Sequence, residues 1–228
     1  MRNKWWAKFL RIFGIVFMSL SAVFTLAAGA GTACVALNPT GFGETFAPIA
    51  PYQWLWILFV LVGVAAGIMG VRAVVMLVKG RKKAYLASLI ALVVSIILNT
   101  IHLVASRSLR GSSMPVDGVL YMNVLTLVIF LLFGIPGIWQ GVNYEKPDDG
   151  NETGKQAGSI AMGAVGLFSL TIQFLMAPTH TIGGFNYADV WHTTLTALGV
   201  LLVAGGILLA VITQYAPVTR RSSASQEQ

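Results

Sequence analysis

Residues 54–77 read WLWILFVLVGVAAGIMGVRAVVML and hold a single charged side chain, Arg72. A helix of about 20 mostly apolar residues crosses the hydrocarbon core of a bilayer, so this stretch predicts a membrane-spanning helix. The whole chain has the same character, because 56% of its 228 residues are hydrophobic and only 10% are charged. A soluble domain carries about 25% charged residues. The composition therefore excludes a soluble globular protein and a disordered chain, and the single cysteine, Cys34, excludes a disulfide scaffold.

Six stretches have the length and composition of a membrane span. They cover residues 12–34, 54–77, 85–105, 119–140, 158–178 and 193–215. The connections between them are short, which places neighbouring helices antiparallel. The sequence thus predicts an all-α, polytopic transmembrane bundle over residues 1–216, followed by a disordered tail over 217–228. Within the fourth span, Pro136 is expected to kink or end the helix.

The basic residues predict the orientation of the bundle. If the N-terminus is cytoplasmic, all of the 15 Lys and Arg residues except Arg72, Arg107 and Arg110 lie in cytoplasmic segments. Basic residues collect on the cytoplasmic side, so we expect both termini there, in a cytoplasmic membrane of bacterial type. One alternative concerns the first span: its basic leader, apolar run and small residues 28–30 also match a signal peptide that is removed.

The formal net charge is +7, and the bilayer accounts for it without nucleic acid. We expect Lys79, Arg81, Lys82 and Lys83 to contact anionic lipid headgroups on the cytoplasmic side. Arg72 lies inside a predicted span, about 27 Å from Trp54 at 1.5 Å per residue. From that depth its side chain can extend to the headgroups. No acidic residue lies in any predicted span.

Three polar residues near the predicted outer ends of the spans are candidate ligand-binding residues: Asn99, His102 and Gln173. Polar side chains inside a membrane bundle often mark a substrate pathway. Asn99 and His102 are one helical turn apart, which places them on one face of the third helix.

The histidines also allow a metal site. His102, His180 and His192 all fall on the predicted outer side, and Asp189 precedes His192 by three residues. Imidazole and carboxylate groups suit zinc or copper, so these four residues are candidate metal ligands. The structural alternative is that Asp189 caps the sixth helix while the histidines bond to loop backbone. Their spacing matches no standard metal motif, and the sequence identifies no cofactor.

Small residues indicate where helices approach closely. Gly63, Gly67 and Gly70 share a face of the second span, and residues 27–33 and 199–206 are similarly rich in glycine and alanine. In a membrane such faces bind another helix. That helix belongs either to the same bundle or to a partner membrane protein.

Three functions are compatible with the sequence. The first is a non-catalytic accessory or scaffold subunit of a membrane assembly, favoured by the scarcity of ionisable groups within the spans, the small-residue faces and the short loops. The second is a small-solute transporter or solute-binding component with an extracytoplasmic site. In length and number of spans the chain resembles the substrate-binding components of energy-coupling-factor vitamin transporters, which implies solute binding. The third is a metal-binding membrane protein that uses the outer histidines.

Overall fold

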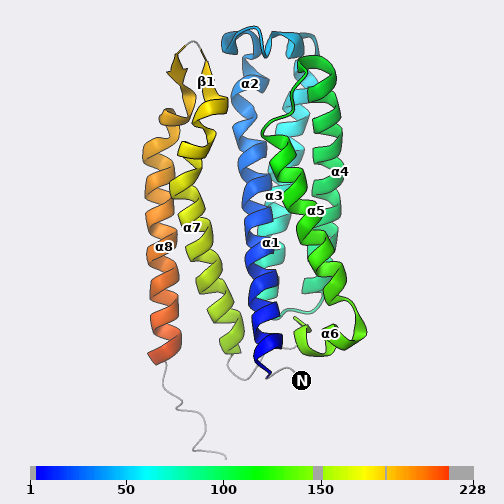
Figure 1. The fold of residues 1–228 in the computed structure, drawn as a ribbon, viewed down its shortest axis with the longest axis vertical. Helices are drawn as coiled ribbons and strands as arrows, with labels where there is room; N and C mark the ends of the chain where they lie inside the picture. The colour runs from blue at the N-terminus through cyan, green and yellow to red at the C-terminus, as the bar shows by residue number, and fades with distance from the viewer. Residues whose placement is uncertain (1–3, 146–150, 183, 216–228) are drawn as a thin grey trace, which may run out of the picture.

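The computed structural model describes residues 4–145, 151–182 and 184–215 of the chain. The tail predicted over 217–228 lies outside these residues. The predicted all-α transmembrane bundle is confirmed, since six helices are long and apolar enough to cross a membrane. The end of the bundle that holds residues 38–52 is here named the capped end, and the end that holds the turn at residues 79–83 is named the basic end (Figure 1).

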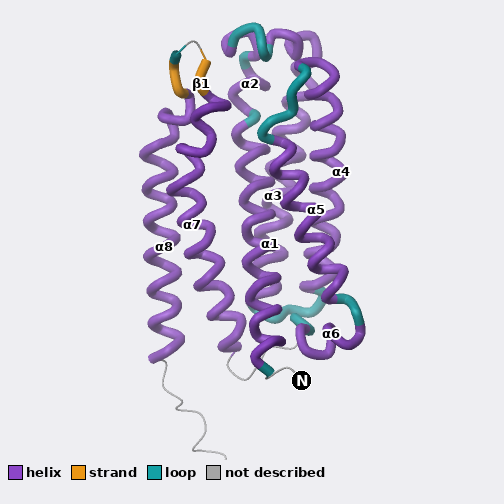
Figure 2. Tube along the Cα trace, in the orientation of Figure 1, coloured by secondary structure: helices purple, strands orange, loops and turns teal. Residues whose placement is uncertain are grey.

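The helices follow one another with short connections (Figure 2). The long ones are α1 (Trp5–Gly31), α3 (Gln53–Val78), α4 (Ala84–Arg110), α5 (Val116–Phe133), α7 (Glu152–His180) and α8 (His192–Tyr215). The short ones are α2 (Ala33–Leu37), η1 (Pro39–Phe42), η2 (Ala47–Tyr52), α6 (Pro136–Val142) and η4 (Tyr187–Trp191). Strands β1 (Thr181–Ile182) and β2 (Phe185–Asn186) form a small antiparallel ribbon between α7 and α8.

The first helix lies at the centre of the bundle. Helix α1 packs against α3, α5 and α7, and α4 packs against α3 and α5 at the edge of the bundle (Figure 1). Helix α8 packs mainly on α7, so these two form a hairpin on one side of α1. Because α1 contacts four of the other five long helices, the folded bundle depends on it.

The predicted fourth span, residues 119–140, differs from the observed helices. Helix α5 ends at Phe133, and a separate short helix, α6, begins at Pro136. Proline lacks a backbone N–H and restricts the residue before it to extended conformations. Ile135 is extended, at φ −61° and ψ 128°, and this residue ends the span as the proline predicts.

Two further boundaries also differ from the predicted spans. Helix α1 begins at Trp5 rather than at residue 12, because its basic first turns are helical as well. Helix α4 continues past residue 105 to Arg110. It stops there because Gly111 adopts the left-handed conformation, at φ 69°, which glycine tolerates and which closes the helix with a bond to the Arg107 carbonyl.

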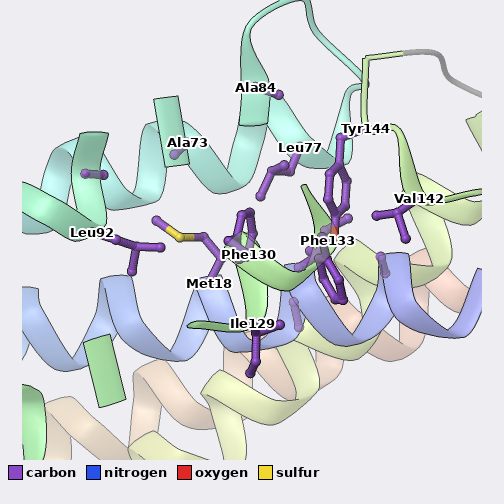
Figure 3. Close-up of a cluster of buried hydrophobic side chains, with 14 residues drawn as sticks. Met18, Ala73, Leu77, Ala84, Leu92, Ile129, Phe130, Phe133, Val142 and Tyr144 are labelled. Atoms are coloured by element: carbon purple, nitrogen blue, oxygen red, sulfur yellow. The ribbon is translucent and has the colours of Figure 1, made fainter. Parts of the chain in front are cut away.

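The basic end holds the larger apolar core. Phe130 is fully buried and its ring stacks on that of Tyr144, with centroids 5.9 Å apart and an angle of 7° (Figure 3). Met18 of α1, Leu77 of α3 and Leu92 of α4 belong to the same cluster. Four helices and the segment after α6 therefore meet in one apolar layer.

The small-residue face of α3 packs against α1. A Cβ added to Gly63 would lie 3.0 Å from the Cα of Gly29, and one added to Gly67 would lie 2.7 Å from the Cα of Leu26. Such backbone contact requires glycine on at least one side. The sequence left open whether this face binds a helix of the same bundle or of a partner protein. In the structure it binds α1 of the same bundle.

The glycines of α8 face α7 in the same way. A Cβ on Gly199 would lie 2.9 Å from the carbonyl oxygen of Gly166, and one on Gly206 would lie 2.8 Å from that of Ser159. The hydroxyl of Ser159 donates a hydrogen bond of 2.7 Å to the Gly206 carbonyl. Both small-residue faces are thus filled by helices of the same chain.

Candidate functional site

Helix α4 carries a buried polar face that runs toward the capped end. Its members are Ser88, Ser95, Asn99, His102 and Ser106. They recur at spacings of three, four and seven residues, which places them on one side of a helix. Exposed residues of the same helix are aliphatic, for instance Ile97 and Ile101. The polar side of α4 therefore faces the protein and its apolar side faces outward, as expected for a helix in lipid.

His102 lies among aromatic rings. It is 8% exposed, and its imidazole stacks on the ring of Phe59, with centroids 4.3 Å apart and an angle of 20°. The Trp56 ring stands perpendicular to it at 6.1 Å. Among the described residues, none forms a hydrogen bond with the His102 ring. A neutral imidazole has one donor and one acceptor nitrogen, and no residue in the described ranges bonds to either.

Asn99 is the polar neighbour of His102 on the same face. Its amide nitrogen donates a hydrogen bond of 2.7 Å to the carbonyl oxygen of Ser95. Its side-chain oxygen accepts no hydrogen bond from any residue in the described ranges. At 1.5 Å per residue, Asn99 and His102 lie about 16 Å and about 12 Å from Arg110, the last residue of α4. Both positions are inside the span. Their unbonded atoms do not belong to the fully enclosed unbonded atoms of the described residues, so a solute can approach them.

A second polar contact joins α1 to α5 and was not predicted from the sequence. The amide nitrogen of Asn123 donates a hydrogen bond of 3.0 Å to the hydroxyl of Thr25. One turn away, the hydroxyls of Ser21 and Thr126 are 2.6 Å apart. All four side chains are buried. The Asn123 amide nitrogen and the three hydroxyls each have a partner, so the contact links α1 to α5. The Asn123 side-chain oxygen, like that of Asn99, accepts no hydrogen bond from the described residues.

The capped end carries an ion pair, again without a signal in the sequence. The Arg107 guanidinium lies 3.3 Å from the Asp117 carboxylate, and the hydroxyl of Ser113 donates to the same carboxylate at 2.7 Å. Arg110 lies over the ring of Phe46, 4.2 Å from its centroid. These contacts hold the start of α5 and the segment before α3 against the end of α4.

Gln173 is buried but lies elsewhere. It belongs to α7, which packs on α1 and α8, whereas Asn99 and His102 belong to α4, which packs on α3 and α5. The Gln173 amide nitrogen donates a bond of 3.3 Å to the Leu170 carbonyl, and its side-chain oxygen has no donor within the described part of the chain. The structure therefore brings together two of the three predicted ligand-binding residues and leaves the third apart.

The predicted metal ligands occupy different elements. His102 is buried in α4, His180 ends α7, and His192 begins α8 with its side chain exposed. A His180 ring nitrogen lies 3.0 Å from the Met176 carbonyl oxygen, and the Asp189 carboxylate accepts a 3.0 Å bond from Asn186. Over residues 4–145, 151–182 and 184–215 there is no group of three or more His, Cys, Asp or Glu side chains able to hold a metal ion.

The predicted lipid-contacting residues lie at the basic end. Arg72 is exposed near the end of α3, and Lys79, Arg81, Lys82 and Lys83 are exposed around the turn into α4. The turn itself is held by a hydrogen bond of 2.9 Å from the Lys83 backbone N–H to the Glu145 carboxylate.

Compared with models of protein families, with curated proteins and with solved structures, the chain matches none. Its function is therefore argued from the chemistry of its own residues.

Proposed function

We propose that this chain is a membrane-embedded solute-binding protein that takes up a small neutral polar molecule between Asn99, His102 and the aromatic pair Trp56 and Phe59. The observation that carries the proposal is the unused hydrogen-bonding capacity of two adjacent buried side chains. A polar group in hydrocarbon without a partner costs about 1–3 kcal/mol on the scale of protein mutations. Two such groups one turn apart are best explained by a molecule that bonds to both.

The chemistry of Asn99, His102, Trp56 and Phe59 defines the class of molecule. The Asn99 oxygen needs a donor, and the His102 ring offers one donor and one acceptor. The rings of Phe59 and Trp56 favour a flat or apolar body beside those groups. The buried members of the α4 polar face include no charged side chain. A charged ligand would therefore lack a counter-ion at this depth, and a neutral amide, lactam or heteroaromatic molecule fits better.

The competing hypothesis of an accessory subunit loses one of its three supports, the small-residue faces. Gly63, Gly67, Gly199 and Gly206 all pack against helices of the same chain. The rest of α8 presents aliphatic side chains such as Leu201, which lipid tails cover equally well. The metal hypothesis gains no cluster of ligands among the described residues.

The proposal also includes the orientation. With the basic end in the cytoplasm, as the distribution of Lys and Arg favours, the site opens toward the extracytoplasmic side of a cytoplasmic membrane of bacterial type. The solute would then be collected from outside the cell.

Ligand-dependent thermal stability of the full chain in mild detergent tests this function. A panel of neutral amides, lactams and heteroaromatic compounds should contain at least one that stabilises the protein, by about 2.7 kcal/mol at a hundred times its dissociation constant. His102→Phe keeps a ring beside Phe59 but removes both ring nitrogens. Asn99→Leu keeps the side-chain volume but removes the acceptor oxygen. Each variant should lose the stabilisation by the ligand. Thr100→Val is the control, because Thr100 is exposed and bonds only to its own helix, at the Ile96 carbonyl. No stabilisation by any compound, or equal stabilisation of His102→Phe, would refute the proposal.

A further inference from the structure

Arg72 points away from the bundle. It follows Gly63, which packs on α1, by nine residues, and nine residues make two and a half helical turns. The Arg72 side chain therefore lies on the face of α3 opposite to Gly63. Arg72 is accordingly exposed, as are Ile68 and Val75 on the same face, at 58% and 44%. In the membrane this face of α3 contacts lipid.

The position of Arg72 demands a negatively charged partner. Arginine stays protonated in proteins, and a charge inside a span is costly unless it is paired or reaches the interface. Among the described residues Arg72 has no ion pair and no hydrogen bond. It precedes Lys79 by seven residues, which is about 10 Å along the helix. Its guanidinium can reach the phosphate layer by extending toward the basic end.

Lys79 lies on the same face as Arg72, because seven residues are almost two full turns. It is exposed, and so are Arg81, Lys82 and Lys83 just beyond it. The Glu145 carboxylate accepts its bond from the Lys83 backbone N–H, which fixes the turn. The cations therefore stand at a defined place rather than on a loose loop.

The surface beside these cations is aliphatic. On α3 it includes Val75, and on α4, which packs against α3, it includes Leu86 and Ile90, at 50% and 48% exposed. A cationic border above an aliphatic surface matches the two parts of a phospholipid, an anionic headgroup and its acyl chains.

We propose that the outward face of α3 binds one anionic phospholipid, with its phosphate between Arg72 and Lys79 and its headgroup toward Arg81 and Lys82. A partner protein with a carboxylate in its span is the other conceivable occupant. It is disfavoured because one carboxylate would match Arg72 alone and leave the remaining cations unexplained. The lipid satisfies both the deep guanidinium and the cations at the interface.

Native mass spectrometry of the full chain, extracted with mild detergent and titrated with phosphatidylglycerol or phosphatidylcholine, tests this site. The parent should bind phosphatidylglycerol more tightly than phosphatidylcholine. A basic residue near an anionic surface contributes about 1 kcal/mol, so Arg72→Gln and Lys79→Gln should each weaken phosphatidylglycerol binding about fivefold, and the double variant about 25-fold. Arg72→Lys, which keeps the charge, should retain the preference for the anionic lipid.

Lys155→Gln is the matched control, because Lys155 is exposed at the start of α7, at the same end of the bundle, and its loss changes the net charge equally. It should change the affinity for phosphatidylglycerol less than twofold. Equal loss in Lys155→Gln would mean that net charge attracts lipid without a site, and unchanged affinity in the double variant would mean that Arg72 and Lys79 do not bind it. Either result overturns the proposal, as does a copurifying protein that is lost in Arg72→Gln while lipid binding is kept. Circular dichroism checks that each variant keeps its helical content. We expect the variants to fold, because the side chains of Arg72 and Lys79 are exposed.

Discussion

Replacing Gly67 by alanine tests whether the contact between α1 and α3 organises the bundle. The added Cβ would lie 2.7 Å from both the Cα and the Cβ of Leu26 and 2.8 Å from its backbone nitrogen. Carbon atoms pack at about 3.5–4.0 Å, so the overlap approaches 1 Å. Two of the three nearest atoms are backbone, which cannot turn aside as a flexible side chain can. The helices must therefore separate.

The separation weakens neighbouring contacts as well. Gly70 meets Ala22 one turn further along, where a Cβ would lie 2.8 Å from the Ala22 Cβ. A gap of about 0.5–1 Å forfeits a quarter to a half of each dispersion contact. Overpacking of this kind costs about 1–3 kcal/mol. We expect the free energy of unfolding to fall by that amount relative to a glycine that has room for a methyl group.

Gly163 of α7 provides that reference, because a Cβ added there meets nothing within 4 Å. Both substitutions raise helix propensity by about 1 kcal/mol, and this gain cancels when the two variants are compared. The assay is unfolding in mixtures of mild detergent and dodecyl sulfate, followed by circular dichroism. If Gly67→Ala proves as stable as Gly163→Ala, α1 and α3 are not in close backbone contact at Gly67, and this contact does not organise the bundle.

Three other substitutions probe the polar contacts. Asn123→Leu removes the bond to Thr25 and should lower the free energy of unfolding in the same assay by about 0.6–1.7 kcal/mol; no loss would mean that α1 and α5 do not depend on this bond. Asp117→Asn removes the pairing charge for Arg107, whose side chain is 56% exposed, and should cost less than about 1 kcal/mol in that assay; a larger loss would contradict a solvent-screened pair. Burial raises the pKa of Tyr144, so above about pH 10 the unfolded chain loses a proton that the folded chain keeps, and stability falls as pH rises. Tyr144→Phe should therefore flatten the decline in the free energy of unfolding between about pH 9 and about pH 11, and an unchanged slope would argue against a buried hydroxyl.

The membrane spans could be predicted from the sequence because the signal for each is local. A run of apolar residues such as 54–77 has to be a helix in lipid, whatever its neighbours are. The ends of the helices depend on less local features. Residues 106–110 carry polar and basic side chains that normally indicate a loop, yet α4 includes them because Arg107 pairs with Asp117 and Arg110 covers Phe46. Those partners are known only once the fold is known.

The candidate site could be predicted only in part, because some of its features are local in the sequence and others depend on how the helices pack. Asn99 and His102 are three residues apart, so helical periodicity alone places them together. Gln173 could be identified as a buried polar residue, but its separation from them depends on the order in which helices pack. The partnership of Asn123 with Thr25 joins residues almost a hundred positions apart, and no local pattern connects them. Single-sequence patterns therefore located polar residues within a helix and failed to pair them between helices.

The two ends of the bundle differ in a way that bears on function. Along α4, Leu92 belongs to the apolar core of the basic end, whereas Asn99 and His102 lie beyond it toward the capped end. On α5, Phe130 lies in that core and fills it with a fully buried ring. A polar path across the membrane would have to pass this apolar layer, which holds aromatic and aliphatic side chains at close packing. Asn99 and His102 therefore lie on the capped-end side of this layer, and a solute bound beside them would have to disturb the layer in order to cross the bundle.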